Sequence, residues 1–127
     1  MATARTGKKA PKFDARSFLT ATGASHTTYM SGGIVFEQGT TADAVFYIQK
    51  GRIQVTIVSD QGKEGVIGIL GAGDFFGEGC LSGQPLHLAT ATALADTGIL
   101  KIDKAIMTRM LRDEPSFASL FMTFLLT

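Results

Sequence analysis

The sequence has a single cysteine, Cys80, and no apolar run long enough to cross a membrane. One cysteine excludes an intramolecular disulfide, a cysteine-rich zinc site and a cysteine-ligated iron–sulfur cluster. The N-terminus also lacks the apolar segment of a secretory signal. Together these absences favour a cytoplasmic protein in a reducing compartment, with no membrane contact.

Permanent charge is also scarce. Charged residues make up 18% of the 127 residues and the formal net charge is +1, which gives no general reason to expect a nucleic-acid or membrane partner. Five of the twelve Lys and Arg residues lie within the first sixteen positions, and none lies between Lys63 and Lys101. The middle of the chain is therefore expected to carry no permanent positive charge.

The length predicts one domain preceded by a short tail. Residues 1–12 are rich in Ala, Thr and Lys and show no periodicity, so we expect a mobile N-terminal tail. Residues 13–21 include Phe13, Phe18 and Leu19, which predict a short helix packed on the body. The domain itself is predicted to span residues 13–127.

Between residues 26 and 102, short stretches rich in β-branched and aromatic residues alternate with turns that contain glycine. These stretches predict strands over 26–30, 34–36, 44–49, 53–57, 66–70, 90–95 and 99–102. The last two strands are expected to be joined by a turn at 96–98. About eight short strands with frequent turns are typical of a sandwich or a jelly-roll barrel. The predicted fold class is mainly β with flanking helices.

The pattern changes at residues 103–127, which predict two helices. Asp103 is a good N-cap for the first, and Pro115 suits the first turn of the second. The second helix is apolar on almost every side, so it needs burial on several sides. We expect it to pack into a partner subunit, or the natural polypeptide to continue beyond this sequence. Self-association is expected in either case.

The stretch from Asp74 to Thr90 is the one most suggestive of a ligand. Its glycines at 77, 79 and 83 allow the backbone to turn several N–H groups toward one anion, as phosphate-binding nests do. Glu78 then acts either as a ligand carboxylate or as a structural partner of turn amides. His87 is either a phosphate-binding or pH-sensing group or an ordinary loop histidine. Cys80 is expected to be a small packed thiol, and Asp74 a turn former.

Three segments carry a resemblance to a known family. They are Val45-Phe46-Tyr47-Ile48-Gln49-Lys50-Gly51, the run IGILGAGDFFG from 67 to 77, and Phe76-Gly77-Glu78 followed by Gln84-Pro85 and Ala89-Thr90-Ala91. Together they resemble the cyclic nucleotide-binding domain, a jelly-roll barrel, and in particular the sensory domain of bacterial Crp/Fnr-type transcription regulators. The resemblance covers residues 13–127. It implies cAMP or another cyclic nucleotide as a small-molecule effector, a homodimer through the C-terminal helices, and DNA contact only through a helix-turn-helix domain that this sequence lacks.

The resemblance also implies roles for individual residues. Gly77 is the close-approach glycine, and Glu78 accepts from the ribose 2′-hydroxyl. Gly79 and Cys80 offer N–H groups to the phosphate, while Leu88, Ala89 and Thr90 lie along the far side of the pocket. His87 stands where the family has a phosphate-binding arginine, ten residues after the glycine. Losing one charge-assisted hydrogen bond weakens binding by roughly 10- to 150-fold, so we expect weak affinity for cAMP.

Two other functions are alternatives to the sensory domain of a Crp/Fnr-type regulator. The first is a stand-alone ligand-binding or dimerisation module whose nucleotide site has degenerated. The second is a cupin-type metalloenzyme, which has the same barrel but needs several His and Glu ligands converging inside it. The sequence has only two histidines, His26 and His87, and no pattern of a nucleophile beside a base. We therefore expect no enzymatic activity, no catalytic residue and no metal site.

Overall fold

The computed structural model describes residues 23–126. The tail predicted over 1–12 and the helix predicted over 13–21 lie outside the described residues. Within 23–126, the eight strands, one 3₁₀-helix and two α-helices confirm a mainly β fold with C-terminal helices. No helix in this range combines the length and the apolar character that crossing a membrane requires.

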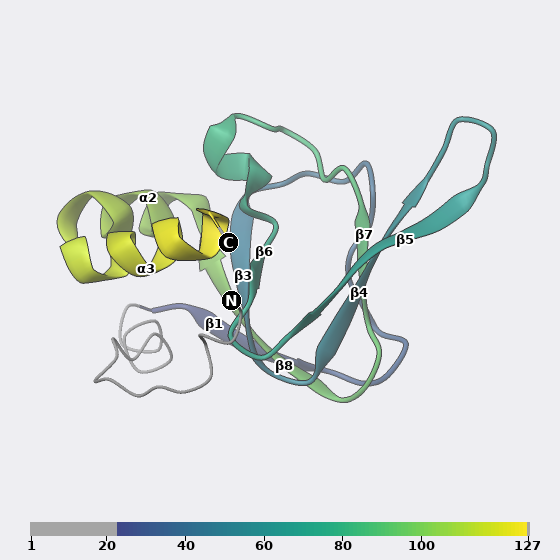
Figure 1. The fold of residues 1–127 in the computed structure, drawn as a ribbon, viewed down its shortest axis with the longest axis horizontal. Helices are drawn as coiled ribbons and strands as arrows, with labels where there is room; N and C mark the ends of the chain where they lie inside the picture. The colour runs from purple at the N-terminus through teal and green to yellow at the C-terminus, as the bar shows by residue number, and fades with distance from the viewer. Residues whose placement is uncertain (1–22, 127) are drawn as a thin grey trace.

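Two antiparallel four-stranded sheets form the body (Figure 1). The strands are β1 (Ser25–Tyr29), β2 (Ile34–Phe36), β3 (Ala44–Lys50), β4 (Arg52–Val58), β5 (Glu64–Gly71), β6 (Phe75–Phe76), β7 (Thr90–Ala93) and β8 (Thr97–Asp103). One sheet has the order β1-β8-β3-β6 and the other the order β2-β7-β4-β5. Strands that are adjacent in space are often distant in sequence, which is typical of jelly-roll topologies.

The turn predicted at 96–98 is wrong by two residues, because Thr97 and Gly98 belong to β8. Thr97 is fully buried, and its hydroxyl is satisfied there. It donates to the carbonyl of Ala95 at 2.8 Å and lies within hydrogen-bonding distance of both the N–H and the carbonyl of Arg52. Thr97, which the sequence placed in a turn, therefore connects the start of β8 to β4 through hydrogen bonds.

The strand predicted over 53–57 is present, but its apolar residues are not equally buried. Ile53 is fully buried and Val55 is partly buried against the core between the sheets. Ile57 remains 37% exposed, because the β4–β5 hairpin projects beyond the other sheet (Figure 1). Burial along β4 therefore ends where the facing sheet ends.

Aromatic rings dominate the core between the sheets. Phe46 of β3 and Phe76 of β6 stack with centroids 5.2 Å apart, and Phe36 of β2 lies 5.3 Å from Phe46. Aromatic pairs at such distances contribute beyond the area that they bury. This cluster joins the two sheets at the end where β6 leads into the glycine-rich stretch.

The C-terminal helices α2 (Lys104–Asp113) and α3 (Pro115–Leu126) form a second core against the β1-β8-β3-β6 sheet. Asp103 occupies the N-cap position of α2 as predicted, but its side chain makes no capping hydrogen bond. The centroids of the Phe117 and Phe121 rings of α3 lie 6.1 and 5.1 Å from that of Phe75, both edge-on. Phe75 of β6 therefore contacts α3 directly, within a core that also includes Val45, Leu100 and Ile102 of the sheet.

The docking of α3 predicts a large difference between its two faces. Phe117 is fully buried, whereas Met122 is 56% exposed. Phe117→Ala should lower the free energy of unfolding by about 3–5 kcal/mol because it leaves a cavity against Phe75. Met122→Ala, the matched control on the same helix, should change it by less than about 0.5 kcal/mol. Urea denaturation monitored by circular dichroism measures both, and equal effects would contradict the described packing of α3.

Candidate ligand pocket

The glycine-rich stretch begins with a turn that only glycine can make here. Gly77 follows β6 with φ 77° and ψ 15°, in the left-handed region. A Cβ at this position would lie 2.9 Å from Cδ1 of the Phe46 ring. The chain then enters the 3₁₀-helix η2 (Glu78–Ser82) and returns through a loop to β7. The position of Glu78 is therefore fixed by the aromatic core directly beneath it.

A cavity of about 220 Å³ opens between η2, the loop before β7 and the inner face of the β2-β7-β4-β5 sheet. Seven of the eight predicted ligand residues line it: Gly77, Glu78, Gly79, Cys80, His87, Leu88 and Ala89. Six further residues complete its wall: Phe36, Ala42, Val55, Phe76, Gln84 and Leu86. Among residues 23–126, no Lys or Arg lines the wall, as expected from the lack of basic residues between Lys63 and Lys101.

Thr90 is the predicted site residue that the structure does not bring into the cavity wall. It is the first residue of β7, and its hydroxyl accepts from the N–H of Gln38 at 2.9 Å. The Gln38 side chain in turn bonds to both backbone groups of Val58. Thr90 thus connects β7 to the turn after β2, and its predicted contact with a ligand stays a prediction.

The backbone donors of η2 differ in part from those expected. In a 3₁₀-helix each N–H bonds to the carbonyl three residues earlier. In a 3₁₀-helix that begins at Glu78 after the N-cap Gly77, this pattern leaves the N–H groups of Glu78 and Gly79 without a partner in the helix and assigns the Cys80 N–H to the carbonyl of Gly77. Glu78 and Gly79 are therefore the N–H donors that this geometry leaves for a ligand.

Cys80 is a packed thiol, as expected. It is buried, and its Sγ lies 3.6 Å from the carbonyl oxygen of Ala44, to which it donates. Burial is the main cause that raises the pKa of the Cys80 thiol, and Lys104 opposes it. A raised thiol pKa lowers the thiolate fraction, which is the opposite of what a redox-sensing cysteine requires. Cys80 therefore serves as part of the pocket wall.

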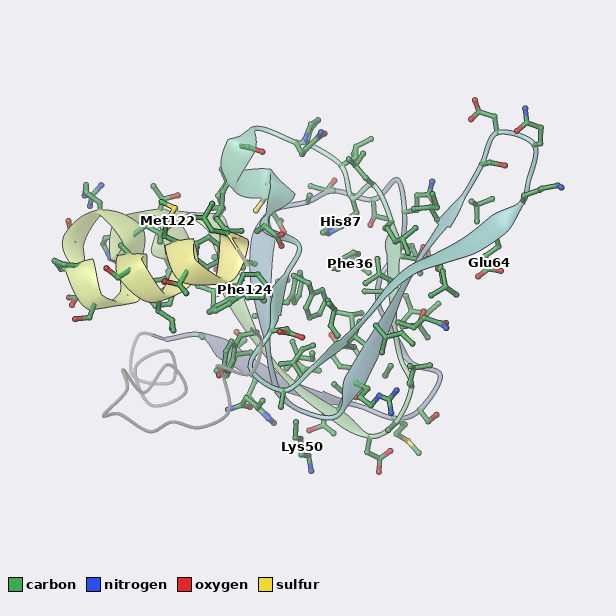
Figure 2. All side chains as sticks on the ribbon, in the orientation of Figure 1. Phe36, Lys50, Glu64, His87, Met122 and Phe124 are labelled. Carbon is green, nitrogen blue, oxygen red and sulfur yellow. The ribbon has the colours of Figure 1, made fainter. Side chains whose placement is uncertain are left out.

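His87 lies inside the pocket rather than on an exposed loop (Figure 2). Its ring stacks on Phe36, with centroids 3.6 Å apart and planes 5° from parallel, and the residue is only 8% exposed. Its N–H donates to the carbonyl of Thr40 at 2.8 Å, and its carbonyl accepts from the N–H of Gly39 at 2.8 Å. Burial lowers the pKa of the imidazole, and Asp43 partly opposes this shift.

Glu78 is half-buried at the cavity wall and keeps its carboxylate unengaged. Among residues 23–126 the one ion pair joins Arg112 and Asp113, and no described group donates to the Glu78 side chain. The alternative in which Glu78 holds turn amides is therefore not supported. Asp74 does act as a turn former, because its Oδ2 accepts from the N–H of Gly71 at 2.9 Å.

Sequence reasoning missed the cavity residues that come from other strands. Phe36 and Val55 were assigned to strands, but nothing local indicates that these strands cross opposite η2. Phe76 could have been identified as a cavity residue from the sequence, since it directly precedes the Gly-Glu turn. Within the described range, no group of three or more His, Cys, Asp or Glu side chains is placed to hold a metal ion.

The buried imidazole predicts how stability depends on pH. Because the folded-state pKa of His87 is lowered, the unfolded chain binds a proton more readily than the folded domain. The free energy of unfolding should therefore fall as the pH drops below about 6.5, by at most about 1.4 kcal/mol per pH unit for one group. His87→Gln should lose this component, whereas the control His26→Gln, on exposed β1, should keep it. The measurement is the free energy of unfolding at a series of pH values between neutral pH and the range in which carboxylates titrate. If this free energy changed with pH in His87→Gln as it does in the unsubstituted protein, the described burial of His87 would be contradicted.

Comparison with known proteins adds the family. The chain is 36% identical over 88 residues to a cGMP-dependent protein kinase of Drosophila melanogaster (isozyme 2, forms cD5/T2), covering 67% of this chain and 9% of the kinase. It is 26% identical over 85 residues to lysophospholipase nte1 of Aspergillus terreus, covering 67% of this chain and 6% of the relative. The chain thus spans less than a tenth of the length of either curated relative.

The fold has a counterpart in a bacterial protein of known structure. The catabolite activator protein of Thermus thermophilus superposes with a TM-score of 0.76 and 24% identity, over 87% of this chain and 51% of that one. This likeness establishes the fold and agrees with the predicted jelly-roll class. The profile of the cyclic nucleotide-binding domain matches residues 26–114 of the 127. The chain therefore belongs to the cyclic nucleotide-binding domain family.

Proposed function

We propose that this chain is the effector-sensing domain of a Crp/Fnr-type transcription regulator, and that its effector is cAMP or another cyclic nucleotide. One observation carries the proposal: Gly77, Glu78 and His87 converge on a single cavity between the sheets. The domain binds its ligand and catalyses no reaction. DNA is contacted through a domain outside this chain.

The cavity offers a complementary group for each part of a cyclic nucleotide. The unengaged Glu78 carboxylate can accept from a ribose hydroxyl, and the N–H groups of Glu78 and Gly79 can donate to the phosphate. Val55, Leu86 and Leu88 supply apolar surface for the base. Leu88 is 64% exposed, so it lies at the rim, where a bound base would cover it.

The choice of a Crp/Fnr-type parent rests on the three sequence segments described above and on the end of α3. Met122, Leu125 and Leu126 remain exposed there, and exposed apolar residues gathered on one helix end favour an interface. We propose that α3 contributes to a homodimer. Sedimentation equilibrium should then detect dimers that Leu126→Glu weakens.

The stand-alone module remains the second candidate, and one observation favours it: in the part of the chain that the structure describes, no Lys or Arg lines the cavity. A module that has lost nucleotide binding would dimerise without responding to cyclic nucleotides. The cupin-type enzyme has no comparable support among residues 23–126, where no metal-ligand cluster occurs. Metal analysis of the purified protein tests it directly.

The proposed ligand predicts a gain of affinity on restoring a permanent cation. At about pH 7.5 His87 is neutral, so the unsubstituted protein should bind cAMP weakly. His87→Arg should tighten binding by roughly 10- to 150-fold, because guanidinium forms charge-assisted hydrogen bonds with the phosphate. Isothermal titration calorimetry measures both. Sub-micromolar binding by the unsubstituted protein, or no gain in His87→Arg, would contradict the assignment of His87 to the phosphate.

The role of Glu78 predicts a dependence on the ribose hydroxyl. In the His87→Arg background, Glu78→Gln should weaken cAMP binding by roughly 10-fold or more, but should barely change the affinity for 2′-deoxy-cAMP. Glu64→Gln is the matched control, because Glu64 lies on the projecting β5 hairpin, away from the cavity (Figure 2). Equal losses for both ligands would assign Glu78 to a role other than binding the 2′-hydroxyl.

A further inference from the structure

We propose that the pocket binds an anionic phosphodiester together with one proton, which His87 takes up, so that affinity rises as the pH falls. This inference rests on the proposed function, since it concerns the same cavity. It adds a regulation of that site by pH. It also makes the cyclic nucleotide a ligand whose binding changes the charge of the protein.

The described part of the cavity wall holds ionisable side chains of opposite kind. Among residues 23–126, His87 is the one lining side chain that can become cationic below neutral pH, and Glu78 is the one lining carboxylate. Without a proton on His87, these described side chains carry only negative charge. A phosphodiester monoanion would then rely on the N–H groups of Glu78 and Gly79 alone.

The backbone and the ring of His87 are both held in place. Both backbone groups of His87 are bonded to the turn at 39–40, and its ring is held flat on Phe36. No described group bonds to either ring nitrogen, so the edge of the ring is available to a ligand in the cavity that it lines. The proton therefore has a fixed position from which to meet an anion.

The site can hold the charged form of the His87 ring. An imidazolium 3.6 Å above Phe36 has the geometry of a cation–π contact, which favours the charged form. Burial acts in the opposite direction and lowers the pKa of His87 in the free protein. The imidazole is consequently neutral near pH 7 when the cavity is empty, and an anion beside it shifts the balance toward the imidazolium.

Other charged and titratable groups lie around His87. Asp43, on the segment before β3, acts on the imidazole through its charge. Glu78 of η2 faces the same cavity, and the buried Cys80 thiol has a raised pKa. Glu37 begins the turn that holds His87 and is not part of the described wall. Apart from His87, β4 and the loop before β7 contribute only uncharged side chains to that wall. The His87→Gln variant therefore decides whether a response of binding to pH depends on the imidazole.

Linkage fixes the sign and the size of the effect. A ligand that raises the pKa of one group binds more tightly as the pH falls, by at most about tenfold per pH unit, between the pKa of the complex and that of the free protein. The phosphodiester of cAMP stays anionic throughout. From about pH 7.5 to about pH 5.5, the association constant of the unsubstituted protein for cAMP should rise, by at most about 100-fold over the two pH units.

Calorimetric titration of the full chain with cAMP across this pH range tests the inference. Repeating it in buffers with different ionisation enthalpies counts the protons taken up, which should be more than zero and at most one per cAMP. His87→Arg, which always carries its charge, should bind tightly with no dependence on pH. His87→Gln should bind weakly at every pH, and the control His26→Gln should behave like the unsubstituted protein.

The outcomes separate this inference from the proposed function. If the unsubstituted protein binds cAMP with an affinity that does not change with pH, the proton coupling is wrong and the proposed function stands. If neither the unsubstituted protein at the acidic end nor His87→Arg binds cAMP while circular dichroism shows both folded, the proposed function is wrong and the coupling falls with it. The pH series on the unsubstituted protein needs no variant to fold.

Discussion

Two adjacent aromatic residues that point to opposite sides of β6 hold the structure together. Neighbouring residues on a strand face opposite sides of the sheet, so Phe75 packs against α3 while Phe76 packs against Phe36 and Phe46 between the sheets. The next residue, Gly77, turns the chain into η2. The core between the sheets, the core beneath the helices and the start of the ligand loop therefore depend on the same three consecutive residues.

This arrangement places His87 at the edge of the aromatic cluster between the sheets, in contact with Phe36. Phe76 stacks on Phe46, Phe36 lies against both, and the imidazole stacks on Phe36. The packing at position 87 therefore favours a planar group. A guanidinium is also planar and stacks on aromatic faces, so an arginine can be accommodated against Phe36.

The sequence predicted the fold class and the two C-terminal helices, because glycines, alternation and helical spacing are local signals. The eight ligand residues rest on the family resemblance, and seven of them lie in the cavity wall. Contacts between distant segments are not visible in local patterns. Thr90 is not in that wall, and nothing local shows that its hydroxyl accepts from the N–H of Gln38. Phe36 was read only as a strand residue, because its contact with His87 joins residues 51 positions apart. The exposure of Ile57 depends on where the facing sheet ends, which no pattern within β4 records.

The candidate ligand cavity and the core beneath the helices share a residue. Cys80 lines the ligand cavity and is also part of the core beneath α2 and α3, together with Met107 and Phe117. A ligand that bonds to the N–H groups of Glu78 and Gly79 acts on the residues immediately before it. Since close-packed cores transmit small displacements rather than absorb them, any movement of η2 must be accommodated by the helices. The same connection could link this domain to a kinase, a lipase or a DNA-binding domain. A function therefore has to be inferred from the residues of the cavity and not from the fold.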